Sequence, residues 1–222
     1  MRILLIFGVL AILTVAISFI GRWAGQTLSM GGHTNSTDIQ DVFIDRDHLR
    51  IPANLIRFPA QRRTGTTDRI NLHFTWPEMQ GFTTSNSVRF NDQSQSETLL
   101  YIELSRRVMT YDMTDRFQPI YQTLLDGTTR EGPAGLTIHP FKPDGPYKGE
   151  AILTKDRDGA RSFVIRCILP AQGEPTSAAD CQRDVYLGQD LSVMVRYSSK
   201  LLPQWNEIDQ AVDKAILSLI SD

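Results

Sequence analysis

The histidines of this 222-residue chain are its natural candidates for a general base: His33, His48, His73 and His139. A hydrolytic site needs an activated Ser or Cys, a base and an acid that orients the base. The sequence contains no Gly-x-Ser-x-Gly nucleophile turn. His139 lies beside a loop and is the best-placed base, whereas His33 lies in a flexible segment and His73 is predicted on the polar, solvent side of a strand. The sequence therefore predicts no catalytic residue.

Carboxylates gather at two places where they could bind a cation. Asp45 and Asp47 would alternate along a strand and point the same way, with His48 beside them. Clusters this short are also common on solvated surfaces, which is the simpler interpretation. The run from Thr154 to Gly159 overlaps the calcium-binding EF-hand pattern, but its first position is Thr and its twelfth is Ile165. Two essential oxygen ligands are thus missing, so this run predicts a tight hairpin, and no metal or cofactor site is predicted.

The two cysteines, Cys167 and Cys181, are predicted to form a disulfide. An even number of cysteines in an exported domain favours a bridge. This bridge would close a loop of about 15 residues, worth roughly 3 kcal/mol in the chain-entropy model. The alternatives are two free thiols, one of them buried in a strand, or a metal site. The sequence offers that metal no third cysteine and no nearby histidine.

Two segments rich in arginine form the candidate interaction surface. The loop after residue 56 has the main local concentration of positive charge, which could meet anionic lipid or an acidic partner. Residues 106–121 mix arginine with tyrosine, and both residue types are favoured at protein interfaces. The residues predicted to contact a partner are Arg57, Arg62, Arg63, Arg106, Arg107, Tyr111 and Arg116. An ordinary solvated surface is the alternative for both segments.

Residues 3–21 predict a transmembrane helix. These 19 positions carry no charge, and their only polar side chains are Thr14 and Ser18. At about 1.5 Å per residue they cover the roughly 30 Å core of a bilayer. The alternative is a cleaved signal peptide, which would have a shorter apolar core and a small-x-small cleavage site. The basic flank at Arg2 favours a cytoplasmic N-terminus, so the rest of the chain is predicted outside the cytosol, in the periplasm of a bacterium.

The chain divides into three predicted regions. Residues 1–23 are the uncleaved signal-anchor, residues 24–41 are a small, polar, flexible stalk, and residues 42–222 form one soluble domain. The part after the anchor has 25 acidic residues and 21 basic ones, all but Arg2 and Arg22, for a formal charge of −4. Mild acidity without a Lys/Arg tract argues against binding to nucleic acid.

Hydrophobic periodicity predicts the elements of the domain. Strands are predicted at residues 70–76, 99–107, 136–139 and 191–197, with a hairpin of residues 150–155 and 162–169. Residues 83–98 predict a long surface loop, and residues 114–125 predict a short helix interrupted by a proline.

The end of the chain predicts an amphipathic helix over residues 201–220, with Ser198 or Ser199 as its cap. Its apolar stripe must be buried, most simply against the sheet. The predicted fold class is therefore α+β: one N-terminal transmembrane helix and one soluble domain, with a mainly antiparallel sheet and a C-terminal helix packed on it.

Function is less determined than fold. A short tether and a domain without a reactive constellation favour a non-enzymatic module that binds a protein partner or assists envelope assembly. A membrane-anchored hydrolase is the first alternative, and a deep pocket with a perturbed histidine or carboxylate would favour it. An inhibitor of the immunity type, which neutralises a toxic enzyme in the same compartment, is the second alternative. The predicted partners are the bilayer, through residues 3–21, and a protein.

Overall fold

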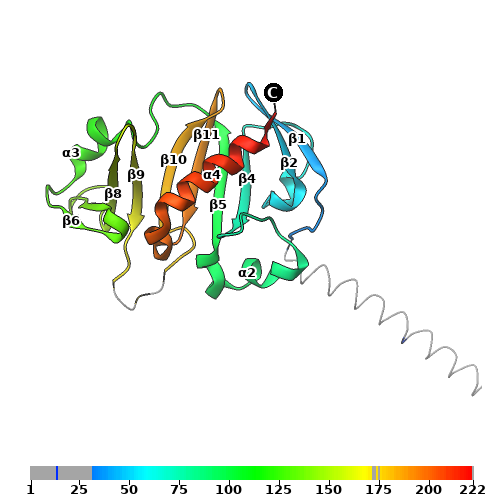
Figure 1. Cartoon of the computed structure of the whole chain (residues 1–222), viewed down its shortest axis with the longest axis horizontal. Helices are drawn as coiled ribbons and strands as arrows, with labels where there is room; N and C mark the ends of the chain where they lie inside the picture. Colours follow the sequence, from blue (N-terminus) through cyan, green and yellow to red (C-terminus); the bar gives the residue numbers. More distant parts are fainter. Residues whose placement is uncertain (1–13, 15–31, 172–173, 175, 222) are drawn as a thin grey trace, which may run out of the picture.

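The computed structural model describes residues 14, 32–171, 174 and 176–221. Two β-sheets and one long C-terminal helix dominate this part of the chain (Figure 1). Paired strands run antiparallel except β1 and β3, which pair in parallel. The prediction of an α+β domain with a mainly antiparallel sheet and a C-terminal helix is confirmed.

The larger sheet has eight strands in the order β4-β5-β11-β10-β9-β8-β7-β6. Their bounds are β4 Arg69–Thr75, β5 Leu99–Arg106, β6 Arg130–Glu131, β7 Thr137–Pro140, β8 Glu150–Arg157, β9 Ala160–Ile168, β10 Cys181–Leu187 and β11 Leu191–Tyr197. The predicted strands and the predicted hairpin all have counterparts among them. β10 has none, because Arg183 and Asp184 break the hydrophobic alternation on which strand prediction depends.

The predicted disulfide is confirmed and lies at a weak point of this sheet. Cys167 of β9 and Cys181 of β10 are register partners and are bridged. β10 pairs with β9 only at Cys181↔Cys167 and Gln182↔Arg166, whereas β10 and β11 pair at seven positions. The covalent bond therefore joins the two halves of the sheet at a ladder of two register pairs.

The smaller sheet has the order β12-β2-β1-β3. Its strands are β1 Ile39–Ile44, β2 Asp47–Pro52, β3 Gly65–Thr66 and β12 Ile220–Ser221. The buried carboxylate of Asp47 fastens this sheet to the β10–β11 turn. It accepts hydrogen bonds from the backbone N–H groups of Gln189, at 2.9 Å, and Asp190, at 2.7 Å.

Most helical segments are short. Their bounds are η1 Ala53–Leu55, η2 Pro59–Gln61, η3 Thr84–Asn86, α2 Ser87–Asn91, η4 Gln93–Thr98, the π-helix η5 Phe117–Tyr121, α3 Gln122–Leu124, η6 Pro133–Gly135, η7 Ser199–Gln204 and α4 Trp205–Leu219. The surface loop predicted at residues 83–98 thus contains three short helical segments. The helix predicted at 114–125 is a π-helical turn followed by α3.

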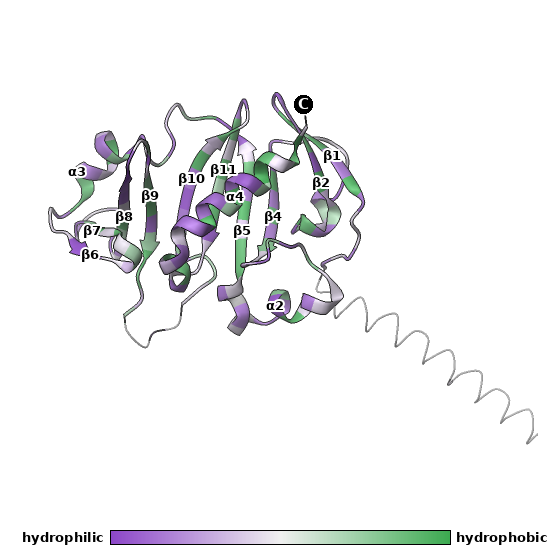
Figure 2. Cartoon of the chain, viewed as in Figure 1, coloured by the Kyte–Doolittle hydropathy of each residue, from purple (hydrophilic) through white to green (hydrophobic). Residues whose placement is uncertain are grey.

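The C-terminal helix α4 covers one face of the larger sheet (Figure 1). Ser198 caps the preceding η7 turn by accepting a hydrogen bond from the N–H of Lys200, as one of the two predicted caps. Figure 2 shows apolar and polar residues interleaved along α4. Its apolar stripe is buried through Trp205, Ile208, Val212 and Ile216. The sheet, rather than solvent, therefore receives this stripe, as predicted.

Polar contacts of α4 with two arginines of the sheet also fix the helix in this position. Asp209 forms ion pairs with Arg157, at 2.7 Å, and with Arg183, at 3.0 Å. The Arg157 guanidinium also stacks over the ring of Trp205 at 4.9 Å from its centroid. Both arginines come from the sheet, so the helix is held by charge as well as by apolar packing.

The predicted transmembrane helix, residues 3–21, lies outside the described residues apart from Thr14. Within the described ranges, no helix is long and apolar enough to cross a membrane. β1 begins at Ile39, a little before the predicted start of the domain at Val42. His33, in the predicted stalk, packs its ring on Phe82 at 4.9 Å between centroids. The domain thus holds the chain from at least this residue onward.

Candidate protein-binding surface

The two faces of the larger sheet are covered differently. The face under α4 is formed by apolar residues such as Ile102, Leu104, Val193 and Val195. The opposite face is covered near β8 and β9 by residues 113–125, in a second apolar cluster. Near β4 it is covered where Phe90 packs on His73, at 4.6 Å between ring centroids. The central strands lie between these two covers.

Side chains on the central strands of this opposite face are half-exposed. Strand alternation and register bring them together, because cross-strand partners share a face. Tyr101 pairs with Arg196, Glu103 with Met194, and Tyr186 with Ser192. We name this surface the open sheet face, and its members are Asn71, Tyr101, Glu103, Ser105, Tyr186, Ser192, Met194 and Arg196.

Two arginines from the predicted interaction surface stack on tyrosines of the open sheet face. The Arg57 guanidinium lies 4.6 Å from the ring centroid of Tyr101, and that of Arg107 lies 4.2 Å from the centroid of Tyr186. Stacking orders a guanidinium without using the N–H groups at its edge. Arg57 can therefore donate to a partner while its plane is already fixed, whereas Arg107 already donates through Nε and Nη2 to the carbonyls of Met109 and Thr110.

A third predicted residue, Arg116, is brought to the same side but is buried. Its guanidinium is ion-paired with Asp184 of β10. Burial raises the pKa of Asp184, and Arg116 opposes that shift. This pair fixes the segment after β5 on the sheet, so Arg116 supports the surface rather than contacting a partner.

The loop of residues 107–111, which we call the apolar loop, exposes three large side chains. Val108 is 76% exposed, Met109 53% and Tyr111 54%. The backbone beneath them is held in place: the Tyr186 hydroxyl donates to the carbonyl of Met109 at 2.9 Å, and Arg107 donates to the carbonyl of Thr110 at 3.0 Å. These hydrogen bonds hold the loop in a defined conformation with its apolar side chains exposed to solvent.

The segment after the apolar loop is anchored by Asp112, which is fully buried. One carboxylate oxygen accepts the N–H of Thr114 at 2.9 Å and that of Asp115 at 3.3 Å. The same carboxylate is ion-paired with Arg161 of β9. The apolar loop is therefore fixed at both ends, by β5 on one side and by the contacts of the buried Asp112 carboxylate on the other.

The remaining predicted residues have different positions. Arg62 is structural: it donates to the carbonyls of Ile56 at 3.1 Å and Gly32 at 2.7 Å, and burial lowers its pKa. Arg63 is exposed and lines a shallow hollow beside β3. Arg106 is exposed at the end of β5. The structure therefore gathers only part of the predicted surface on one face.

The prediction that His73 lies on a solvent-facing side is wrong. Its side chain does lie on the polar face of β4, but His33, Phe82 and Phe90 cover it, and it is 1% exposed. Burial lowers the pKa of His73 to about 3, and His33 adds to this shift. Its Nε2 lies 3.1 Å from the carbonyl oxygen of Asn54. His73 is a neutral core residue.

His139, the best-placed candidate base, lies 2.9 Å from the Thr154 hydroxyl through Nε2. The pair lines an open hollow of about 420 Å³, together with Phe117 and Ser162. Burial lowers the pKa of His139, so the ring is neutral near pH 7. A triad would need a carboxylate on the other ring nitrogen. In the described part of the chain, no carboxylate bonds to this ring.

The carboxylates of the candidate cation site, Asp45 and Asp47, do not converge. Asp45 occupies the turn between β1 and β2, with a φ of 52°, while Asp47 is buried against the β10–β11 turn. His48 instead lies 2.9 Å from a carboxylate oxygen of Asp41. Among the residues that the structure describes, no group of three His, Cys, Asp or Glu side chains could hold a metal ion. The run from Thr154 to Gly159 forms the end of β8 and the turn of the β8–β9 hairpin, and the hairpin is as predicted.

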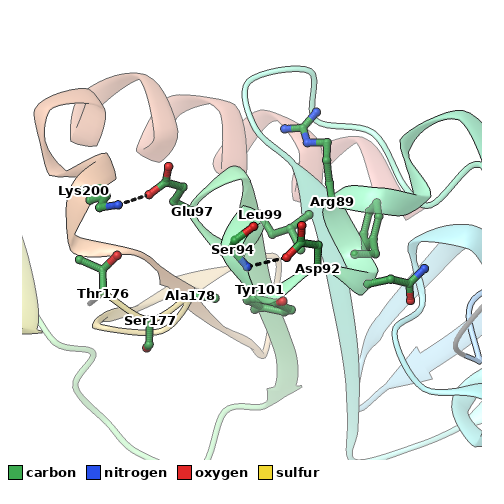
Figure 3. A pocket seen from close by; sticks show the side chains of 12 residues that line it. Arg89, Asp92, Ser94, Glu97, Leu99, Tyr101, Thr176, Ser177, Ala178 and Lys200 are labelled. Atoms are coloured by element: carbon green, nitrogen blue, oxygen red, sulfur yellow. Dashed lines mark hydrogen bonds and ion pairs between the residues drawn. The ribbon is translucent and has the colours of Figure 1, made fainter. Parts of the chain in front are cut away.

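A hollow of about 590 Å³ lies at the Leu99 end of β5 beside the open sheet face (Figure 3). Its charged side chains are already engaged within the protein. Lys200 is paired with Glu97 at 2.6 Å, and Asp92 accepts the N–H of Ser94 at 2.9 Å. Tyr101 belongs to both the hollow and the open sheet face, so the hollow extends that face rather than forming a separate reactive site.

No protein-family model and no curated protein sequence matches this chain. Two solved structures share its fold. One is Smlt3025, an immunity protein of the Stenotrophomonas maltophilia type IV secretion system, with 17% identity, a TM-score of 0.57, and coverage of 87% of this chain and 98% of that one. The other is the Neisseria meningitidis iron-regulated outer membrane lipoprotein FrpD, with 11% identity, a TM-score of 0.51, and coverage of 86% and 96%. At these identities the likeness concerns the fold alone.

Proposed function

We propose that this protein is a membrane-tethered, extracytoplasmic binding protein that docks a partner protein through the apolar loop and the open sheet face. The exposure of Val108, Met109 and Tyr111 on a fixed backbone carries this proposal. Apolar side chains gain free energy when a partner covers them. A preorganised loop loses little conformational entropy in the process.

The surroundings of the apolar loop match the usual composition of a binding centre. Tyrosine and arginine are enriched at the residues that dominate binding energy, and here they occur as stacked pairs. The disulfide supports an oxidising compartment outside the cytosol. The uncharged run of residues 3–21 supports a tether in the membrane.

Inhibition of a toxic enzyme is the form of binding that we favour. The shared fold with an immunity protein supports it, and a rigid apolar loop suits insertion into a cleft of the partner. Deleting the gene should sensitise cells to one co-encoded toxin. The wild-type protein should restore resistance, whereas Val108→Asp should not. If deletion leaves cells resistant to every co-encoded toxin, the inhibitor form is wrong, and docking for envelope assembly remains the broader proposal.

Partner capture tests the docking surface directly. The tagged full-length protein is crosslinked in its native membrane, with a tether-only chain of residues 1–41 as background. Val108→Asp should abolish recovery of the partner, because a charge would be buried at the contact. Val88→Asp, on α2, is the matched control: Val88 is also well exposed, at 64%, but lies away from the apolar loop. Equal loss of the partner in both variants would refute the proposed surface.

The second candidate is a hydrolase acting through the His139–Thr154 contact. In that case Thr154→Val would remove the hydroxyl nucleophile at nearly constant side-chain volume, and the variant would no longer protect cells in the complementation assay. The binding proposal predicts that Thr154→Val retains full partner capture and full protection. The two outcomes separate the candidates in one complementation assay.

A further inference from the structure

We infer that the partner presents an acidic protein surface to the open sheet face; this inference rests on the proposed docking function. Four arginines lie on or beside this face: Arg57, Arg69, Arg107 and Arg196. Within the described residues, none of the four has a carboxylate within salt-bridge distance. Their positive charges are therefore available to a partner.

Negative charge on the same face is scarce or already neutralised. Glu103 is the acidic member of the open sheet face. Asp184, in the neighbouring position of β10, is paired with the buried Arg116. The face thus carries a local excess of positive charge, although the chain after Arg22 has a formal charge of −4. This segregation of charge within an acidic domain marks the face as the counterpart of a negative surface.

The geometry favours carboxylates of a protein over lipid or nucleic acid. Arg57 is stacked on the ring of Tyr101, which leaves its planar edge free for bidentate contact with a carboxylate. Arg107 is stacked on Tyr186 and donates through Nε and Nη2 to carbonyls of its own loop, so it offers a partner its charge and its Nη1 group. Met194 and Ser192 lie between the charged positions and can contact side chains. Nucleic acid would need a denser array of positive charge than four arginines with a glutamate among them.

Photo-crosslinking at the centre of the face tests this inference. In the full-length protein in its native membrane, Ser192 is replaced by p-benzoylphenylalanine, and the crosslinked peptide of the partner is sequenced. The same replacement at Leu217, which is exposed on α4, is the control position. The expected peptide carries a net negative charge. A neutral or basic peptide, or a crosslink to lipid or nucleic acid, would overturn the inference.

Charge reversal supplies a second readout. The double variant Arg57→Glu with Arg196→Glu should lower crosslink yield at least tenfold, and raising salt from about 50 to 500 mM should lower it in the wild type, because screening weakens long-range attraction. Arg130→Glu, on the edge strand β6, is the matched control. The milder variant Arg196→Gln should also lower crosslink yield while its melting temperature stays unchanged. That combination would exclude a folding defect as the cause of the lower yield.

The two proposals can fail separately. If Val108→Asp abolishes capture while charge reversal and salt have no effect, docking stands and the acidic partner surface is refuted. If Val108→Asp leaves capture unchanged, the proposed docking function itself is refuted.

Discussion

Acidification should destabilise this protein through the buried side chain of His73. Its pKa falls from 6.5 to about 3, first because burial removes water from the charged form and second because His33 lies beside it. Nε2 donates one hydrogen bond to the carbonyl oxygen of Asn54, but this does not offset the burial. The folded protein therefore holds His73 neutral at every pH above about 3.

The sign and size of the effect follow from proton linkage. Between pH 6.5 and pH 3 the unfolded chain binds a proton at this residue and the folded chain does not, so stability falls as the pH falls. Each unit of pH below 6.5 costs up to about 1.4 kcal/mol, and pH 5 lies 1.5 units below it. Acidification from pH 7.5 to 5 should therefore cost about 2 kcal/mol from His73.

Urea unfolding at pH 7.5, 6 and 5, followed by tryptophan fluorescence, measures this loss. Trp76 and Trp205 are both buried and report the core. His73→Gln removes the titrating group while keeping a donor for Asn54, so its free energy of unfolding should lose about 2 kcal/mol less than the wild type over this range. His48→Gln, at a half-exposed position, is the control. Equal pH dependence in wild type and His73→Gln would refute the reasoning.

Three further changes should lower stability, each checked by the midpoint of denaturant unfolding. Gly188→Ala should cost about 2 kcal/mol, because φ is +62° and a Cβ would clash with the Asp47 carboxylate that joins the two sheets; a loss below about 0.5 kcal/mol would contradict this. Asp209→Ala should cost about 3–5 kcal/mol by leaving buried Arg183 unpaired under α4, and an unchanged midpoint would show that α4 is held by apolar packing alone. Cys181→Ser should cost roughly 3 kcal/mol, and the wild type in reductant should show the same loss.

Sequence alone determined the elements whose residues alternate cleanly. β4, β5 and β11 were predictable because every second residue is apolar, and α4 because its apolar residues recur every three or four positions. The disulfide was predictable because the two cysteines of a domain expected to be exported have only each other as partners. β10 was not predicted, because its buried residues include Arg183 and Asp184. The tertiary structure buries them by pairing Arg183 with Asp209 and Asp184 with Arg116.

Only the tertiary structure decided which faces of these elements are covered. Strand alternation places His73 on the polar face of β4, but its burial depends on His33 and Phe90, which are distant in sequence. Strand order likewise brings Arg57 and Arg107 to one face, although fifty positions separate them. The fold places the side chains of Arg62 and Arg116 in contacts within the protein instead. Periodicity fixes the direction of a side chain within its own element, whereas exposure depends on what packs above it, and that is a property of the whole fold.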